Sequence, residues 1–285
     1  MVDTKAGATP AELRRGPLIF RQRLATRLTH WAWAVALFFL LLSGLQIFMA
    51  RPDLYIGHQS GFAFDNTVFS IGAVREGGAL RGVTTVFGET FDTTGWLGVV
   101  SEGGAAQVKS FPGWMTIPGY RDLATGRVVH FFFAWILVAT LYFWLVASAI
   151  NGHLRQLLRG ARDLKALPRD LKDHLRLRFH HVGDYNVLQK LSYAGVLFVL
   201  LPLMILTGLT MSPGVNAAAP WMLDLFGGRQ TARTIHFAGM LALVLFFLVH
   251  ILMVLLAGPF NEMRSIVTGW YRTDARPETE KDSVR

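Results

Sequence analysis

Four long apolar segments constrain the fold of this chain more than any other feature. They cover residues 31–49, 128–150, 187–211 and 235–258, and they are uncharged apart from Lys190 in the third. A helix needs about 20 apolar residues to cross a bilayer core of about 30 Å. A helix also satisfies its own backbone hydrogen bonds inside lipid. We therefore predict an all-α membrane protein with a four-helix transmembrane bundle.

The distribution of Lys and Arg indicates how the bundle crosses the membrane. Twenty of the 28 basic residues fall before the first span, between the second and third spans up to Lys190, or after the fourth span; eight fall in the other two loops. Cytoplasmic loops carry the excess of positive charge in membrane proteins. The N- and C-termini are therefore expected in the cytoplasm. The net charge of +9 is then explained by topology and anionic lipid headgroups, not by nucleic-acid binding.

The spans divide the chain into three parts and two conspicuous loops. We expect a cytoplasmic N-terminal segment (1–29), a membrane domain (30–258) and a cytoplasmic C-terminal tail (259–285). The long outer loop, residues 51–126, contains a possible short strand at 83–87 and would be either a cover over the helix ends or a docking surface. The inner loop, residues 151–186, is predicted to form a basic amphipathic helix on the membrane surface.

Two histidines lie fourteen residues apart in the last apolar segment, His236 and His250. At 100° per residue this step falls about 40° short of four turns, so both imidazoles leave the same helix face, separated by roughly 21 Å along the axis. Ionisable groups at such depth are rare and mark electron, proton or ion pathways. One helix therefore presents a ligand near each membrane surface.

Alternating span directions give each of these histidines a counterpart at its own depth. His130 and His236 form an outer pair, and His30 and His250 form an inner pair. A haem held between two helices needs one neutral imidazole on each side of its iron. The chain has no cysteine, which excludes thiolate sites and covalent haem. Zinc or copper fits less well, because each pair has only two protein ligands and no carboxylate at matching depth.

Arginine and glycine positions support the haem interpretation. Arg27, Arg127 and Arg233 each precede a histidine by three residues, so each could reach a haem propionate from one turn nearer the headgroups. Gly44, fourteen residues after His30, would let the outer haem approach its helix. Other glycines, at 195, 208 and 239, are interpreted as packing positions. His153 is a weak candidate for quinone or proton handling.

Four stretches carry a resemblance to a known family: Arg-Leu-Thr-His-Trp (27–31), Arg-Val-Val-His-Phe (127–131), Tyr-Asn-Val-Leu-Gln-Lys (185–190), and the run from Leu203 through Thr207-Gly208-Leu209-Thr210 to Phe226-Gly227-Gly228-Arg229. They resemble the bacterial cytochrome b561-like family, which includes the cytochrome b subunits of nickel-iron hydrogenase, formate dehydrogenase (gamma) and thiosulfate reductase. The likeness covers about residues 17–272 and is strongest to the thiosulfate-reductase type.

The resemblance implies two haem b groups ligated by His30, His130, His236 and His250 in a bacterial inner-membrane protein. It further implies electron transfer between the quinone pool and a periplasmic redox subunit, for which a molybdopterin oxidoreductase is preferred. Asn186, Lys190 and Asn261 are candidate quinone contacts near the inner haem.

Three alternative functions remain open at this stage. The chain could be a haem-free transporter that uses its histidines as a proton relay. It could instead be a purely structural anchor for a periplasmic enzyme, or an anchor subunit of the hydrogenase or formate dehydrogenase type.

Overall fold

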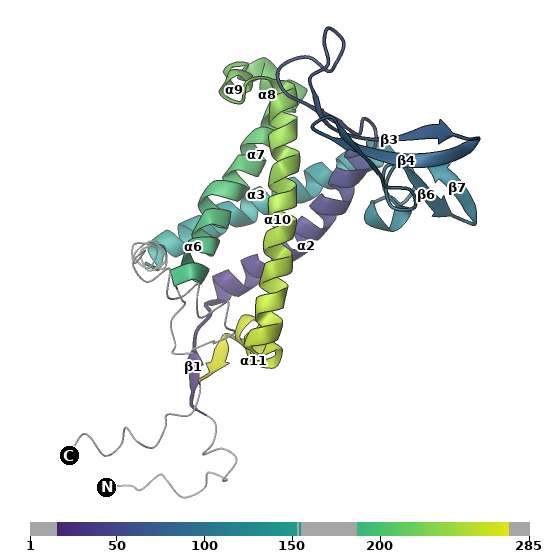
Figure 1. Ribbon diagram of the computed structural model, residues 1–285. Helices are drawn as coiled ribbons and strands as arrows, with labels where there is room; N and C mark the ends of the chain where they lie inside the picture. Colours follow the sequence, from purple (N-terminus) through teal and green to yellow (C-terminus); the bar gives the residue numbers. More distant parts are fainter. Residues whose placement is uncertain (1–15, 153, 155–186, 274–285) are drawn as a thin grey trace, which may run out of the picture. The chain divides into compact units, whose positions relative to one another are not determined.

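The computed structural model describes residues 16–152, 154 and 187–273 (Figure 1). The predicted amphipathic helix of the inner loop lies outside these residues, as do His153 and Asn186.

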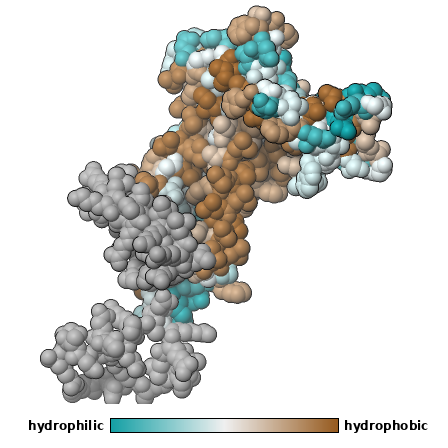
Figure 2. Space-filling model, viewed as in Figure 1, coloured by the Kyte–Doolittle hydropathy of each residue, from teal (hydrophilic) through white to brown (hydrophobic). Residues whose placement is uncertain are grey.

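Within the described residues, four helices are long and apolar enough to cross a membrane, as the sequence predicts. They are α2 (Leu24–Phe48), α3 (Leu123–Ile150), a third helix over Gln189–Thr210, and α10 (Arg229–Ala257). Apolar residues gather over the helical part in Figure 2, and most hydrophilic residues gather away from it. Such an apolar exterior suits contact with lipid. The chain is therefore a multi-pass membrane protein.

The third span is an interrupted helix. It consists of α6 (Val187–Gly195), a π-helical segment (Val196–Leu200) and α7 (Leu201–Thr210). Pro202 in the first turn of α7 lacks a backbone N–H, so the carbonyl one turn earlier loses its usual donor. A π-helical turn is a common way to accommodate such an interruption inside a helix.

The outer loop contains β-structure, so the all-α prediction holds for the membrane part and is incomplete here. One antiparallel sheet has the order β2-β3-β4-β5, and β6 pairs with β7. The predicted strand at 83–87 falls largely within β4 (Figure 1). The strands are β2 (Asp53–Tyr55), β3 (Thr67–Glu76), β4 (Ala79–Val86), β5 (Glu89–Asp92), β6 (Val99–Glu102) and β7 (Ala105–Val108).

Two-residue turns with positive φ connect these strands. They are Gly77-Gly78, Phe87-Gly88 and Gly103-Gly104, and such left-handed pairs match the twist of antiparallel hairpins. The remaining elements are short: β1 (Leu18–Phe20), a 3-10 turn (Gly113–Met115), α8 (Pro213–Ala218), α9 (Trp221–Leu225), α11 (Pro259–Thr268) and β8 (Trp270–Arg272).

The chain forms two compact units, to which α2, α3 and α10 all contribute. One unit comprises Met1–Trp31, Phe143–Gly195 and Phe246–Arg285; in it β1 pairs with β8. The other comprises Ala32–Tyr142 and Val196–Leu245 and therefore holds the outer loop.

An apolar core joins the outer loop to the helices of its unit. Leu45, Phe48 and Met49 at the end of α2 are buried with Leu54, Ile71 and Phe111 of the loop. The Phe237 ring of α10 stacks on Phe48 with centroids 4.6 Å apart. The outer loop is thus a folded cover packed on helix ends.

Candidate functional site

The outer histidine pair brings together the second and fourth spans. His130 of α3 and His236 of α10 have ring centroids 6.4 Å apart and ring planes inclined by 60°. Both residues belong to the unit that carries the outer loop. This is the pairing that the sequence predicts from depth alone.

Each outer histidine is held by a hydroxyl group on a neighbouring helix. Ser43 Oγ of α2 lies 3.1 Å from His130 Nδ1, and Thr207 Oγ1 of α7 lies 2.9 Å from His236 Nδ1. Both hydroxyl side chains are fully buried. Bonds to the second ring nitrogen fix the orientation of a metal-binding imidazole.

A glycine follows each hydroxyl residue and lies against the same histidine. A Cβ atom added to Gly44 would lie 3.3 Å from His130 Cε1, and one added to Gly208 would lie 3.4 Å from His236 Cε1. The dipeptides Ser43-Gly44 and Thr207-Gly208 therefore hold the outer histidines in the same way. Gly44 thus lies at the depth of the outer pair, and its approach to the outer haem stays a prediction.

The inner pair joins the first and fourth spans with the same spacing but different surroundings. The ring centroids of His30 and His250 are 6.3 Å apart, with planes inclined by 55°. His30 Nδ1 is buried and has no hydrogen-bond partner among the described residues. His250 stacks on Phe246, one turn earlier in α10, with centroids 5.9 Å apart. Aromatic packing replaces the hydroxyl groups of the outer pair.

The three arginines predicted to meet propionates have different surroundings. Arg27 donates to the carbonyl of Val267 in α11. Arg127 is exposed, with its guanidinium 5.7 Å from the centre of the Phe131 ring. Arg233 donates to the backbone carbonyls of Asp53, at 2.8 Å, and Arg51.

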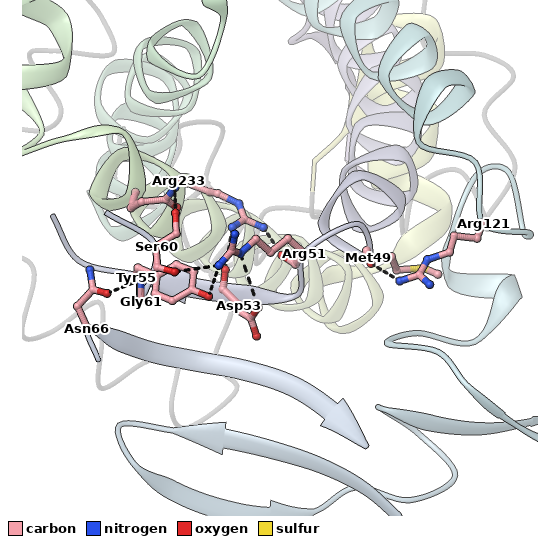
Figure 3. A network of polar contacts seen from close by, with 10 residues as sticks. Met49, Arg51, Asp53, Tyr55, Ser60, Gly61, Asn66, Arg121 and Arg233 are labelled. Carbon is pink, nitrogen blue, oxygen red and sulfur yellow. Dashed lines mark hydrogen bonds and ion pairs between the residues drawn. The ribbon is translucent and has the colours of Figure 1, made fainter. Parts of the chain in front are cut away.

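The first turns of α10 also hold the start of the outer loop by hydrogen bonds. Thr234 Oγ1 donates to the Tyr55 carbonyl at 2.7 Å, and Thr231 Oγ1 accepts the Gly57 N–H at 2.7 Å. Figure 3 shows the adjoining network around Arg51, whose guanidinium contacts Tyr55 and the Ser60 carbonyl. Polar anchoring of the loop thus lies directly beside the outer histidine of α10.

The candidate quinone residues are placed only in part. The amide of Asn261 is engaged with the backbone of Arg272: Nδ2 donates to its carbonyl at 2.8 Å, and Oδ1 accepts its N–H at 3.0 Å. This bonding ties α11 to β8 and gives Asn261 a structural use. Lys190 is half-buried in α6.

The ring spacing in both pairs fits an iron atom held between two imidazoles. Two metal–nitrogen bonds of about 2 Å, together with about 1.1 Å from each ring centre to its nitrogen, put the centres about 6.2 Å apart. Among the described residues, no group of three or more His, Cys, Asp or Glu side chains could hold a metal ion. The donor set, two imidazoles per site, suits a porphyrin that supplies four nitrogens itself.

A membrane helix bundle with paired imidazoles defines a class, the b-type membrane cytochromes. The comparison with known families agrees with this class. Residues 21–269 match the family described as prokaryotic cytochrome b561. The chain belongs to that family, which implies binding of haem b.

One relative gives a more specific likeness. The chain is 28% identical over 232 residues to a protein of Azospira oryzae named putative protein-methionine-sulfoxide reductase subunit YedZ1, covering 81% of this chain and 87% of the relative. No solved structure matches the chain.

Sequence reasoning missed Ser43 and Thr207, and it interpreted Gly208 as a packing position. A serine or threonine inside an apolar helix ordinarily bonds to a carbonyl of its own helix, and both hydroxyls do so here. A signal was nevertheless present, because hydroxyl-glycine dipeptides recur at 43–44 and 207–208, in spans one and three.

Proposed function

We propose that this protein is a dihaem b-type cytochrome that transfers electrons between the membrane quinone pool and a periplasmic oxidoreductase. The observation that carries the proposal is the presence of two imidazole pairs with ring centres 6.3 and 6.4 Å apart. His30 and His250 would hold one haem, and His130 and His236 would hold the other. Bound haem supplies one-electron chemistry at iron.

The residues of the chain would position and tune these haems. Apolar span residues exclude water, which favours the iron state of lower charge. The exposed guanidinium of Arg127 and the remaining N–H groups of Arg27 and Arg233 are proposed propionate partners, because guanidinium groups form strong hydrogen bonds to carboxylates. Each arginine would also add positive charge near a haem.

The quinone site is proposed on the side of the inner pair. Lys190, which belongs to the same compact unit as His30 and His250, is its candidate among the described residues, with Asn186 outside them. The amide of Asn261 already bonds to Arg272, so a quinone contact there would compete with this bonding. Reduction of a quinone requires protons as well as electrons, and a site at the cytoplasmic surface would receive them from the cytoplasm.

The proposed partner is a periplasmic oxidoreductase, preferably a molybdopterin enzyme. The name of the Azospira relative describes a reductase subunit, which supports a reductase as the partner class. The folded outer loop provides a structured surface for such a subunit on the side of the outer pair. We propose the bacterial inner membrane as the location, with both chain ends in the cytoplasm.

Purified protein tests the proposal directly. A reduced-minus-oxidised spectrum with b-type bands and a haem assay giving two haems per chain are expected. A colourless preparation, after expression with adequate haem supply, contradicts the proposal. Reduction of the haems by a quinol analogue in the same preparation tests the quinone step, and co-purification from native membranes tests the partner.

A further inference from the structure

We infer that Ser43 and Thr207 are positioning residues that fix the protonation of the outer histidines and lower the potential of the outer haem. The inference rests on the proposed function, because it assumes that His130 and His236 bind a haem. It starts from the hydrogen bonds that the two buried hydroxyl groups make to the helix backbone.

Each hydroxyl has one hydrogen, and the helix backbone uses it. Ser43 Oγ donates to the Phe39 carbonyl at 2.5 Å, and Thr207 Oγ1 donates to the Leu203 carbonyl at 2.7 Å. A hydroxyl is one donor with two acceptor lone pairs. With its hydrogen engaged by the backbone, each oxygen offers the nearby histidine its lone pairs, which favours a hydrogen on Nδ1 of both rings.

A hydrogen on Nδ1 leaves the lone pair of a neutral imidazole on Nε2. This nitrogen is then the only one in each ring that can bind iron. Each Nδ1 therefore faces a hydroxyl on a neighbouring helix, Ser43 of α2 or Thr207 of α7. Gly44 allows this approach, because a Cβ there would lie 3.3 Å from the His130 ring, and a Cβ at Gly208 would lie 3.4 Å from the His236 ring, at the edge of ordinary contact.

Hydrogen bonds from Nδ1–H change how strongly the outer histidines bind iron. Donation from Nδ1–H makes the imidazole a stronger base toward the metal. A more basic ligand stabilises ferric over ferrous iron, so these bonds lower the midpoint potential. His30 Nδ1 has no such partner among the described residues, so the inner pair lacks this bond on its His30 side.

Redox titration of the purified full chain tests this inference. Ser43→Ala and Thr207→Val should each raise the midpoint potential of one haem and leave the other unchanged, and the double variant should show the larger shift. The conservative variants Ser43→Thr and Thr207→Ser retain a hydroxyl and should keep the midpoint potential of the parent chain. Thr29→Val is the matched control, since the buried Thr29 hydroxyl donates to Ala25 at 2.8 Å and has no histidine partner among the described residues.

The outcomes separate this inference from the proposed function. If both haems bind and neither potential moves in the double variant, the positioning role is wrong while the cytochrome assignment stands. If the parent chain binds no haem, the proposed function itself fails. Loss of one haem in Ser43→Ala supports the inference only if Ser43→Thr regains it, and loss in both contradicts it.

A separate observation concerns α11 and the ribbon formed by β1 and β8. Three apolar residues at helical spacing face outward from α11: Phe260, Met263 and Val267, of which Phe260 is 89% exposed. Two polar residues of α11 face inward, since Ser265 is buried and Asn261 bonds to Arg272. This is the reverse of a helix packed on a water-soluble domain.

The ribbon shows the same reversal. Phe20 and Trp270 are paired in the register and exposed, with ring centroids 5.5 Å apart, whereas Tyr271 is buried beneath the Arg21 guanidinium. Helix α11 begins at Pro259, after Gly258 with φ of 104° and directly beyond the end of α10 at Ala257. It therefore starts where the membrane span ends.

We propose that this surface, formed by Leu18, Phe20, Phe260, Met263, Val267 and Trp270, lies in the headgroup region of the bilayer. Its apolar residues continue the exposed apolar surface of α10, where Leu252, Leu255 and Leu256 are exposed. Arg23 and Arg264 would meet anionic headgroups, because an interfacial helix combines an apolar face with flanking basic residues.

The absence of native cysteine allows a direct test with single spin labels in the full chain. Met263→Cys and Val267→Cys are labelled in vesicles containing phosphatidylglycerol, with Leu252→Cys as a span control and Asp65→Cys as a water control. The two test positions should be more accessible to oxygen, and less accessible to a nickel chelate, than position 65. Accessibility equal to that of position 65 would overturn the proposal.

Discussion

The outer and inner histidine pairs share one geometry but not one environment. Their ring spacings differ by only 0.1 Å, 6.4 against 6.3 Å. The outer pair is held by two buried hydroxyls and two close glycines, whereas the inner pair is packed by aromatic rings and has an unpartnered Nδ1 among the described residues. The helices thus set the distance between the two imidazole rings of each pair, whereas neighbouring side chains set the hydrogen bonding and packing around each ring.

The largest expected effect comes from removing a ligand. His236→Ala and His130→Ala should each abolish binding of the same haem, and His30→Ala and His250→Ala should each abolish binding of the other, because each proposed haem would lose one of the two histidines that would hold it. Haem content and redox titration of the purified variants measure this result. One haem per chain is expected in every variant.

The control is His58→Ala, which alters an exposed histidine of the outer loop and should keep both haems. If variants of His236 and His250 lost the same haem, the predicted pairing of His130 with His236 and of His30 with His250 would be wrong.

A smaller effect is expected at the glycines that only the outer pair possesses. Gly44→Ala places a methyl group 3.3 Å from His130 Cε1, so the ring must shift by a few tenths of an ångström; Gly208→Ala places one 3.4 Å from His236 Cε1, at the edge of ordinary contact, and should have the smaller effect. Partial loss of the outer haem, with the inner haem retained, should appear in spectra at limiting haem. Gly195→Ala, with nothing within 4 Å of its added Cβ, should behave as the parent. Equal loss of both haems would show that the two glycines do not act on the outer pair specifically.

The histidine pairs could be predicted because helix periodicity and membrane thickness are both nearly fixed. Fourteen residues on α10 place two ligands at two depths, and antiparallel neighbours supply their partners at the same depths. The hydroxyls could not be predicted, because Ser43 and Thr207 satisfy their own helix in any environment. Their contacts with His130 and His236 become visible only in the three-dimensional structure.

The outer loop was predicted less well for a different physical reason. The strand predicted at 83–87 is rich in β-branched residues and falls largely within β4, but β5 and β7 are short, exposed strands without an apolar alternation. The Gly-Gly pairs at 77–78 and 103–104 were the available signal, since they favour two-residue hairpin turns. Contacts between the loop and α10 depend on three-dimensional packing and have no local pattern.

The link between the outer pair and the loop predicts a stability effect. Arg233→Met removes the donors to the Asp53 and Arg51 carbonyls and should lower the free energy of unfolding by about 1–3 kcal/mol, because bonds from charged donors are lost. The apparent melting temperature of the purified chain, followed by circular dichroism, should fall. Arg229→Met, on the same helix, serves as the control. A variant as stable as the parent would show that these bonds do not hold the loop.

The smallest expected effect is local to the outer loop and depends on pH. Glu102 of β6 accepts the Gly113 N–H and pairs with Lys109 Nζ at 3.0 Å. The Gly113 N–H bond, with a contribution from Lys109, lowers the pKa of this carboxyl. A lowered pKa in the folded state means that the carboxylate stabilises the turn above its ordinary pKa, and that this contribution is lost as pH falls through the lowered value.

Hydrogen exchange measured on peptides covering residues 109–119 of the full chain tests this local effect. After correction for intrinsic rates, exchange in the parent should be slow near neutral pH and faster in acid. Glu102→Gln should exchange faster already at neutral pH and lose most of the pH dependence, since the amide retains an acceptor but no charge. Glu89→Gln, on the exposed strand β5, should match the parent. A Glu102→Gln profile identical to the parent would show that the turn is held by its backbone alone, as the Met115 N–H bond to the Pro112 carbonyl at 3.0 Å would then be sufficient.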